Sequence, residues 1–296
     1  MSSRVRTTVL PLLAAFIWGI AFVAQKGNAV GTLTFNASRS IVAFLFLCVV
    51  IFIMNHGSAK HLLTGETPAE TRAIWLGGIC CGLALAVATF LQQSGLDADT
   101  EAGKAGFLTA MYIVLVPILG LFLKQRAQVN VWVAVLVAVV GLYLLCVKPG
   151  SQIRLSDLTV LLCSLVFAIQ IQFIDHFGAR CHGVKMSCVQ FLACFVVSAV
   201  PAALSEPLSF SALCESAGPI LYLGIFSSGV AYTLQIVAQK NANPAVVSLL
   251  LSMESVFSVL AGAVILGEVL SLREYIGCAV MAAAVVIVQL PARKRD

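Results

Sequence analysis

Residues 129–147 read VNVWVAVLVAVVGLYLLCV, a run without a single charged side chain. An α-helix rises 1.5 Å per residue, so about 20 such residues cross the hydrocarbon core of a bilayer. Comparable apolar runs recur along the chain, and they predict about ten membrane-spanning helices, at residues 8–26, 33–54, 73–94, 103–123, 129–147, 155–175, 184–204, 217–239, 244–266 and 272–290. We therefore expect an all-α, polytopic membrane protein with short connectors.

The composition of the whole chain agrees with this interpretation. Of its 296 residues, 60% are hydrophobic and 10% are charged, and the mean hydropathy is +1.01. A water-soluble globule needs more polar surface than this. We interpret the net charge of +5 as a sign of topology and of contact with anionic headgroups, not of nucleic-acid binding. The ten cysteines lie mostly inside the expected spans, where they serve as packing residues, and they show no metal-ligand spacing.

The charge of the connectors reverses between the two halves of the chain. The loop after the second expected span carries Lys60 and Arg72, whereas the loop after the seventh carries Glu206 and Glu215 and no basic residue. Because Lys and Arg near span ends stay on the cytoplasmic side, halves with opposite loop charge should insert in opposite orientations. We therefore predict two inverted five-helix repeats, at residues 8–147 and 155–290, the arrangement of an inverted-repeat transporter.

The basic residues also orient the chain. If the N-terminus is cytoplasmic, twelve Lys and Arg residues lie inside and five lie outside, with Arg39 counted separately as intramembrane. This distribution predicts a multi-pass protein of the cell (inner) membrane with both termini in the cytoplasm. The first span runs into Gln25 and Lys26 without a clear cleavage site, so we expect a retained helix and not a signal peptide.

Glu254 is energetically unfavourable inside a membrane span. It lies about ten residues into the ninth expected span, near the bilayer midplane. A charge at a helix centre costs on the order of 2.5 to 3.5 kcal/mol even on the mildest insertion scale. The carboxyl group should therefore face a watery cavity, pair with a cation or be protonated. The alternative to a functional role is a structural carboxylic acid that is hydrogen-bonded to a neighbouring helix.

Arg39, in the second expected span, is the other energetically unfavourable residue. Its guanidinium cannot lose its charge. A pair with Glu254 would satisfy it if the two helices face one cavity, but a helix C-terminus or snorkelling to the outer interface would also do so. Contact with a substrate or gate and plain structural anchoring both stay open. Lys26 and Asp175 lie at corresponding ends of the first and sixth spans, where snorkelling is the default interpretation and gating the alternative.

Polar and aromatic side chains form a stripe on the eighth expected span. Tyr232, Gln235 and Gln239 stand at positions i, i+3 and i+7, so they share one face of a helix. Such a face in a membrane helix should line the protein interior. Gln92 matches Gln239 in the alignment of the two halves and is a weaker candidate for the same role.

The fourth and first spans add further candidates. Thr109 and Tyr112 share a helical face, and Tyr112 takes the register of Glu254 when the halves are aligned with an offset of 142. Trp18 lies mid-span, away from the interfacial belt where Trp usually collects. These side chains either line a substrate chamber or fill the bundle. Small residues, in the pairs Gly78 and Gly82 and Gly224 and Ser228, predict close helix contacts.

The two halves resemble the paired EamA domains of the drug/metabolite transporter superfamily. The resemblance rests on motifs in a fixed order, namely Trp18 and Gly19, Arg39, AGFLTAMYIVLVP at residues 105–117, AYTLQIVAQK at 231–240, MESVF at 253–257 and LGEVLS at 266–271. It implies ten helices, antiparallel repeats, a central cavity reached alternately from either side, and transport of a small metabolite without a bound cofactor. The chain departs from the family at Ser255, where members often carry Pro, and this departure predicts a straighter ninth helix.

These observations lead to one main hypothesis about function. We expect a secondary active transporter that moves a small organic metabolite or drug-like solute by alternating access, and not an enzyme. Export is the favoured direction, and Glu254 would sense either protons or a cationic group of the solute. The alternative is a membrane-embedded enzyme acting on a lipid-linked substrate, which would need a juxtamembrane catalytic cluster. The expected partners are the solute, the lipid bilayer and a second copy in a homodimer, with no metal. The expected site consists of Glu254, Arg39, Tyr112, Tyr232, Gln235 and Trp18, with Gln239, Thr109, Gln92 and Lys26 as weaker members.

Overall fold

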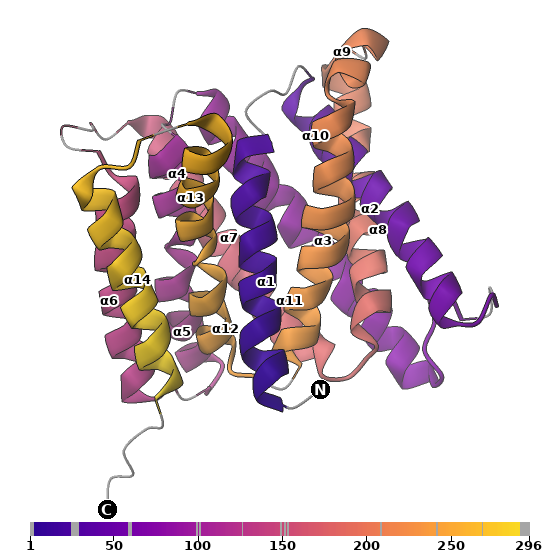
Figure 1. The fold of residues 1–296 in the computed structure, drawn as a ribbon. Coiled ribbons are helices and arrows are strands. Elements are labelled where there is room, and N and C mark those ends of the chain that lie inside the picture. Colours follow the sequence, from indigo (N-terminus) through magenta and orange to yellow (C-terminus); the bar gives the residue numbers. More distant parts are fainter. Residues whose placement is uncertain are drawn as a thin grey trace, which may run out of the picture.

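The computed structural model describes residues 3–24, 30–58, 61–98, 100, 102–125, 127–148, 150, 152, 154–207, 209–240, 242–267 and 269–290. Every regular element within these residues is a helix (Figure 1). In chain order the helices are α1 (Ser3–Ala24), α2 (Thr32–Met54), α3 (Pro68–Asp97), α4 (Ala102–Ala110), α5 (Tyr112–Phe122), α6 (Val129–Cys146), α7 (Leu155–Gly178), α8 (Gly183–Ser205), α9 (Phe210–Glu215), α10 (Ala217–Tyr222), η1 (Leu223–Ala231), α11 (Tyr232–Gln239), α12 (Pro244–Leu251), α13 (Glu254–Leu266) and α14 (Leu272–Gln289).

The expected membrane spans are confirmed within the described residues. Nine helical stretches are long and apolar enough to cross a bilayer, and they coincide with the second to tenth expected spans. The first expected span falls in α1, a helix of 22 residues. The prediction of an all-α polytopic membrane protein is therefore correct.

The helices pack as pairs around a central α1. In Figure 1, α6 and α14 form one flank of the bundle, α2 and α8 form the other, and α1 stands between α13 and α11. Helix α3 lies along both α7 and α8. Each flanking pair joins one helix from each half of the chain, so the two halves are interleaved and not merely side by side.

Helix α1 begins and helix α14 ends at the same face of the bundle (Figure 1). Near the start of α1, the Thr8 hydroxyl donates to Gln289 Oε1 at the end of α14, at 3.3 Å. The connectors α2–α3, α7–α8 and α11–α12 lie at the same face, where Lys185 donates to the Thr64 carbonyl and Lys240 to the Cys181 carbonyl. We call this the terminal face and the opposite one, which carries α9, the distal face (Figure 1).

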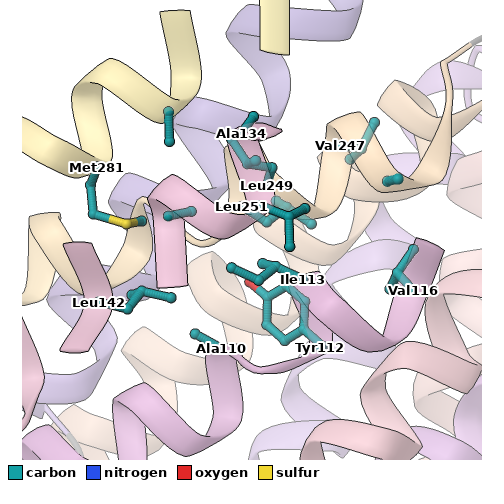
Figure 2. Packing of buried hydrophobic residues seen from close by; sticks show 14 of the residues in the cluster. Ala110, Tyr112, Ile113, Val116, Ala134, Leu142, Val247, Leu249, Leu251 and Met281 are labelled. Atoms are coloured by element: carbon teal, nitrogen blue, oxygen red, sulfur yellow. The ribbon is translucent and has the colours of Figure 1, made fainter. Parts of the chain in front are cut away.

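The main hydrophobic core lies inside the flank formed by α6 and α14. Figure 2 shows α4, α5, α6, α12 and α14 contributing buried side chains to it, including Ala110, Tyr112, Ile113, Val116, Ala134, Leu142, Val247, Leu249, Leu251 and Met281. Burial of each large aliphatic side chain stabilises a fold by roughly 1.5–3 kcal/mol in water. In a bilayer the lipid tails are equally apolar, so close packing must hold these helices together.

Glycines give the close helix contacts that the sequence predicts. A Cβ atom at Gly78 would lie 2.5 Å from Cβ of Val189, and one at Gly82 would lie 2.4 Å from the carbonyl oxygen of Gln190. Both glycines therefore let α3 approach the backbone of α8. Gly224 plays the same part between η1 and α2, because a Cβ there would lie 2.5 Å from Val42 Cγ1.

Two of the spans are interrupted at matching points. The expected fourth span is divided into α4 and α5 at Met111, and the ninth is divided into α12 and α13 at Ser252 and Met253. Met111 and Met253 share the same backbone angles, φ −60° and ψ −12°. Each donates its N–H three residues back, to Leu108 at 3.2 Å and to Leu250 at 3.3 Å. The two halves therefore bend in the same way at equivalent positions.

The ninth span is interrupted even though Ser255 stands where family members often carry Pro. The hydroxyls of Ser248 and Ser252 donate to the carbonyls of Ala245 and Leu249, at 3.0 and 2.7 Å. Serine side chains that bond back to the preceding turn compete with the hydrogen bonds of the helix and often bend it. The interruption therefore needs no proline.

The eighth span contains an element that the sequence does not predict. The span itself, Ala217–Gln239, agrees with the expected residues 217–239, but its middle nine residues form the π-helix η1. A π-helix bonds each N–H five residues back and is frequent at functional sites. The face that Tyr232 shares with Gln235 and Gln239 is preserved, because α11 returns to α-helical geometry.

Candidate functional site

A cavity lies at the centre of the bundle, where both halves of the chain meet. Its volume is about 60 Å³. A cavity needs roughly 10–15 Å³ on this measure to hold one water molecule, so the space has room for a few. The lining residues come from both halves: Trp18, Ala21, Arg39, Thr89, Gln92, Thr109, Tyr112, Phe167, Gln170, Ile171, Ser227, Tyr232, Gln235, Leu251 and Glu254. Eight of the ten predicted site residues are among them.

Glu254 and Tyr112 meet at the cavity wall. Glu254 is the first residue of α13, Tyr112 is the first residue of α5, and both side chains are buried. The Tyr112 hydroxyl donates to Glu254 Oε1 at 3.2 Å. Glu254 therefore combines the two interpretations of its sequence position, because it faces a cavity and is also hydrogen-bonded to a neighbouring helix.

The interruptions of the two spans place these side chains. Helix α12 ends shortly before Glu254, and α4 ends shortly before Tyr112. Each side chain thus starts a new helix at the middle of its span, directly after a turn whose N–H groups bond three residues back, as Met253 does to Leu250 and Ser255 to Ser252.

Arg39 approaches the cavity from α2, and its side chain is half-buried. Its Nε donates to Oδ1 of Asn36 at 3.1 Å, one helical turn earlier. Asn36 is buried and donates in turn to Oγ of Ser198 on α8, at 2.8 Å. A chain of neutral hydrogen bonds from α8 therefore fixes the direction of the guanidinium.

Arg39 and Glu254 form no ion pair, although both are described and both line the cavity. Each charge instead has a neutral partner, Asn36 for the arginine and Tyr112 for the glutamate. An unpaired ionisable side chain inside a membrane protein typically marks a solute or ion pathway. The cavity thus presents a cation on one wall and a carboxyl group on another.

Trp18 and Tyr232 form another wall, and Phe191 packs behind Tyr232. The Tyr232 ring lies 4.7 Å from the ring of Trp18 and 5.7 Å from that of Phe191, measured between centroids. The indole N–H of Trp18 donates to the carbonyl of Ser227 in η1, at 3.1 Å. Trp18 therefore spans the contact between α1 and the π-helix, and its mid-span position reflects a hydrogen bond as well as packing.

Amide side chains complete the lining. Gln92 donates to the Thr109 hydroxyl at 3.0 Å, and Gln170 donates to Gln190 Oε1 at 3.3 Å. The Oε1 atoms of Gln170 and Gln235 are buried without a hydrogen-bond partner in the part of the chain that the structure describes. These two acceptors are therefore unsatisfied in this conformation, although the residues that carry them line the cavity.

Several lining residues escaped the sequence interpretation: Thr89, Phe167, Gln170, Ile171 and Ser227. A signal existed for Gln170, because the run FAIQIQF at residues 167–173 places two amides in the middle of an apolar span. The other four are ordinary residues of membrane helices, and nothing in the sequence distinguishes them.

Gln239 lies outside the cavity, toward the terminal face. Its side chain donates to the carbonyl of Ile171 at 3.0 Å, and Gln172 donates to the carbonyl of Val116 at 2.9 Å. These two bonds tie α11 to α7 and α7 to α5. Gln239 therefore contributes to a hydrogen-bonded layer between the cavity and the terminal face.

Of the two predicted gating residues, only Asp175 belongs to the described part of the chain. Asp175 accepts a hydrogen bond from Gln125, at 2.8 Å, in the same layer near the terminal face. Lys26 lies outside the described residues.

A carboxylate also ties helices together at the distal face. Glu206, just after α8, accepts from the backbone N–H groups of Leu33 and Thr34 at the start of α2, at 2.9 and 2.8 Å. Burial by itself raises the pKa of Glu206, but hydrogen bonds from the Thr34 side chain and from the two N–H groups outweigh it and hold the pKa below its ordinary value. A second tie of this kind is the buried ion pair of Lys104 and Asp157, which joins α4 to α7.

Metal ligation finds no support among the described residues, where no group of three or more His, Cys, Asp or Glu side chains is placed to hold an ion. Cys181 and His182 are the adjacent pair that most resembles ligands. Burial raises the pKa of the Cys181 thiol to about 11, and burial followed by the charge of Lys185 lowers the pKa of His182.

Comparison with known families agrees with this architecture. The model of the EamA-like transporter family matches residues 6–147 and again residues 154–290. The chain belongs to this family. The resemblance drawn from Trp18, Arg39 and the motifs around Tyr112 and Glu254 is thereby confirmed.

Two individual relatives illustrate the match. An uncharacterized transporter of Archaeoglobus fulgidus is 30% identical over 281 residues, which cover 94% of this chain and 84% of the relative. A crystal structure of another protein superposes with a TM-score of 0.81 at 18% identity, covering 99% of this chain and 100% of its own. At that identity the second match shows the fold alone. The family therefore identifies a membrane transporter, and the cavity is the place to look for its solute.

Proposed function

We propose that this EamA-like protein is a secondary active transporter that moves a small organic metabolite or drug-like solute across the inner membrane by alternating access. The observation that carries the proposal is the central cavity, in which Arg39 from one half and Glu254 from the other face the same space without pairing. Membership of a transporter family favours this function over an enzyme acting on a lipid-linked substrate.

The inverted arrangement of the repeats at residues 8–147 and 155–290 is part of the proposal. Five spans in each half place equivalent helices in opposite orientations. The matching interruptions at Met111 and Met253 support an origin of the two halves in one repeat. So does the contact between Tyr112 and Glu254, since equivalent residues can touch only close to an axis that relates the halves.

We assign the roles of the lining residues from their contacts. Glu254 binds a proton or a cationic group of the solute, with Tyr112 fixing the direction of its carboxyl group. Arg39 balances charge or holds an anionic group. The remaining side chains shape the chamber and offer it neutral hydrogen bonds: Trp18, Tyr232, Gln235, Gln92 and Thr109.

Access from the two sides differs in this conformation. The bonds of Gln239 and Gln172 to backbone carbonyls lie between the cavity and the terminal face. With both termini in the cytoplasm, this layer closes the cytoplasmic side. A space of about 60 Å³ is also small for most metabolites, so loading a solute requires the halves to move apart.

Proton coupling, export and a homodimer complete the proposal. Glu254 is the titratable carboxyl group among the cavity-lining residues, so it is the candidate for carrying the proton. The exposed apolar faces of α6 and α14, which include Leu136, Val140 and Val286, suit either lipid or a second copy.

Transport from a defined mixture tests the proposal even though the solute is unidentified. Proteoliposomes loaded with a library of small metabolites are placed under a pH gradient, and mass spectrometry quantifies what leaves. We expect at least one solute to leave faster than from empty liposomes, and Glu254→Gln to abolish the effect of the gradient. Glu215→Gln, an exposed carboxylate on α9, is the matched control. Undiminished, pH-dependent flux in Glu254→Gln would remove the proposed role of this residue.

A further inference from the structure

Most N–H groups of the Arg39 guanidinium have no hydrogen-bond partner among the described residues. An arginine has five N–H donors, and Arg39 uses one of them, at Nε, to bond Asn36. Its two Nη atoms make no hydrogen bond or ion pair with any residue that the structure describes. A partly desolvated cation with four free donors is costly unless something else binds it. Because Arg39 lines the cavity, a solute in the cavity can bind these free donors.

The partner of Nε is itself held firmly. Asn36 is 3% exposed and donates through Nδ2 to Ser198 Oγ on α8, with Cys194 Sγ 3.9 Å from the same nitrogen. Ser40 adds a hydroxyl to this group, 3.3 Å from Cys194 Sγ. Because its nitrogen is directed at α8, the amide must direct its oxygen at Arg39. The amide can satisfy Nε, but it cannot neutralise the charge.

This geometry leaves one mode of approach to the guanidinium. A carboxylate binds arginine through two parallel N–H···O bonds, either side-on at Nε and Nη or end-on at the two Nη atoms. Asn36 occupies Nε, so the end-on mode is the one left open. The rigid fork of the guanidinium matches a planar oxyanion better than a spherical ion.

We propose that Asn36 is a positioning residue that holds Arg39 as the oxyanion-binding group of the cavity, and that the site takes the carboxylate of a solute end-on. The inference rests on the proposed function, because it chooses solute binding over charge balance as the role of Arg39. Ser198 acts through Asn36 and touches no solute.

Acetate is a suitable probe, because it carries the carboxylate alone and is small enough for the cavity. Saturation-transfer NMR on the full chain in nanodiscs gives its dissociation constant at constant ionic strength. We expect saturable binding to the wild type and none to Arg39→Gln. Arg39→Lys should bind at least about tenfold more weakly, because a lysine offers a point charge without the fork.

Two substitutions at Asn36 test whether this residue positions the Arg39 guanidinium for acetate binding. Asn36→Ala frees Nε and should weaken acetate binding about tenfold, because the guanidinium loses the bond that directs it. Asn36→Asp places a carboxylate against Nε, so it should pair with Arg39 and abolish acetate binding. If either protein fails to fold, Ser198→Ala removes the hydrogen bond behind Asn36 and should weaken binding several-fold. Ser187→Ala is its matched control, because that buried α8 hydroxyl bonds Thr233 and not Asn36.

Several outcomes would overturn the inference. Wild-type affinity in Arg39→Gln would show that acetate binds elsewhere. Wild-type affinity in Asn36→Ala or Asn36→Asp would leave Asn36 without a positioning role. Chloride that competes as strongly as acetate would indicate a point-charge site and not an oxyanion site. Solute flux from the metabolite mixture, lost in Glu254→Gln, would keep the proposed function intact in all of these cases.

Discussion

Tyr112 and Glu254 stand 142 residues apart, at equivalent positions in the two halves, and their side chains touch across the centre of the molecule. The same register carries a phenol in one half and a carboxyl group in the other. Both residues open a helix directly after an interruption, so the backbone frame around them is nearly the same. The same backbone arrangement thus carries two different side chains. As a result, the polar groups of the cavity are not distributed equally between the two halves.

The contact between these residues should be measurable as a coupling free energy. Tyr112→Phe removes the hydroxyl and keeps the ring, and Glu254→Gln keeps the shape and removes the charge. We expect a double-mutant cycle on unfolding in detergent to give a coupling of about 1 kcal/mol, the usual size for a buried side-chain hydrogen bond. Additive effects would mean that the hydrogen bond contributes nothing to the fold.

A matched tyrosine provides the control for this cycle. Tyr143 on α6 is half exposed, and its ring lies beneath the guanidinium of Arg273, away from Glu254. Tyr143→Phe combined with Glu254→Gln should therefore give additive effects, within about 0.5 kcal/mol.

Glu206 should make stability depend on pH at the distal face. Hydrogen bonds from Leu33 and Thr34 hold its pKa below the ordinary value, so the stability it contributes is fully present above the unfolded pKa of about 4.3 and is lost as the pH falls through the folded pKa. Glu206→Gln should cost about 1 kcal/mol at pH 7, as the loss of a helix cap does. In unfolding experiments, the difference from the wild type should begin to shrink only below about pH 4 and be lost as the pH falls through the lowered pKa of the folded state.

The substitution Glu215→Gln serves as the comparison, since that carboxylate is exposed on α9. Its stability should follow the wild type across the same pH range. A constant gap between Glu206→Gln and the wild type at all pH values would show that the ionisation of Glu206 is not what caps α2.

The spans and the class of fold can be predicted because they depend on composition alone. An apolar run as long as residues 129–147 has one stable solution in a bilayer, a helix with its backbone satisfied internally. The interruptions at Met111 and Met253 cannot be predicted in this way. The second depends on which hydrogen bonds Ser248 and Ser252 make within the preceding turn, and serine is equally compatible with a regular helix.

Some residues of the site can be predicted from the sequence, and others cannot. Glu254 and Arg39 can be found in the sequence because a charge in hydrocarbon is costly wherever it occurs. Asn36 and Ser198 cannot, because each is an ordinary polar residue until the packing of α2 against α8 brings them within 2.8 Å across 162 residues of sequence. Residues that act by holding another side chain carry no signal of their own.

The contact of α3 with α8 should be sensitive to a single methyl group. Gly82→Ala would place a Cβ 2.4 Å from the Gln190 carbonyl oxygen, and a backbone atom cannot move aside cheaply. We expect a loss of about 1–3 kcal/mol in unfolding free energy, the usual cost of overpacking. Gly106→Ala is the control, because a Cβ there meets nothing within 4 Å and alanine favours the helix by about 1 kcal/mol. Equal effects of the two substitutions would rule out a tight α3–α8 contact.

The orientation in the membrane can be tested on a native side chain. Cys214 on α9 is the one exposed cysteine of the ten, and it lies at the distal face, opposite the end where α1 begins and α14 ends (Figure 1). If both termini are cytoplasmic, a membrane-impermeant maleimide added to intact spheroplasts should label the protein once. Cys214→Ser should remove the label, and Cys278→Ser, which lies within a span, should leave it unchanged. Labelling that appears only after the membrane is permeabilised would place the distal face inside and reverse the proposed topology.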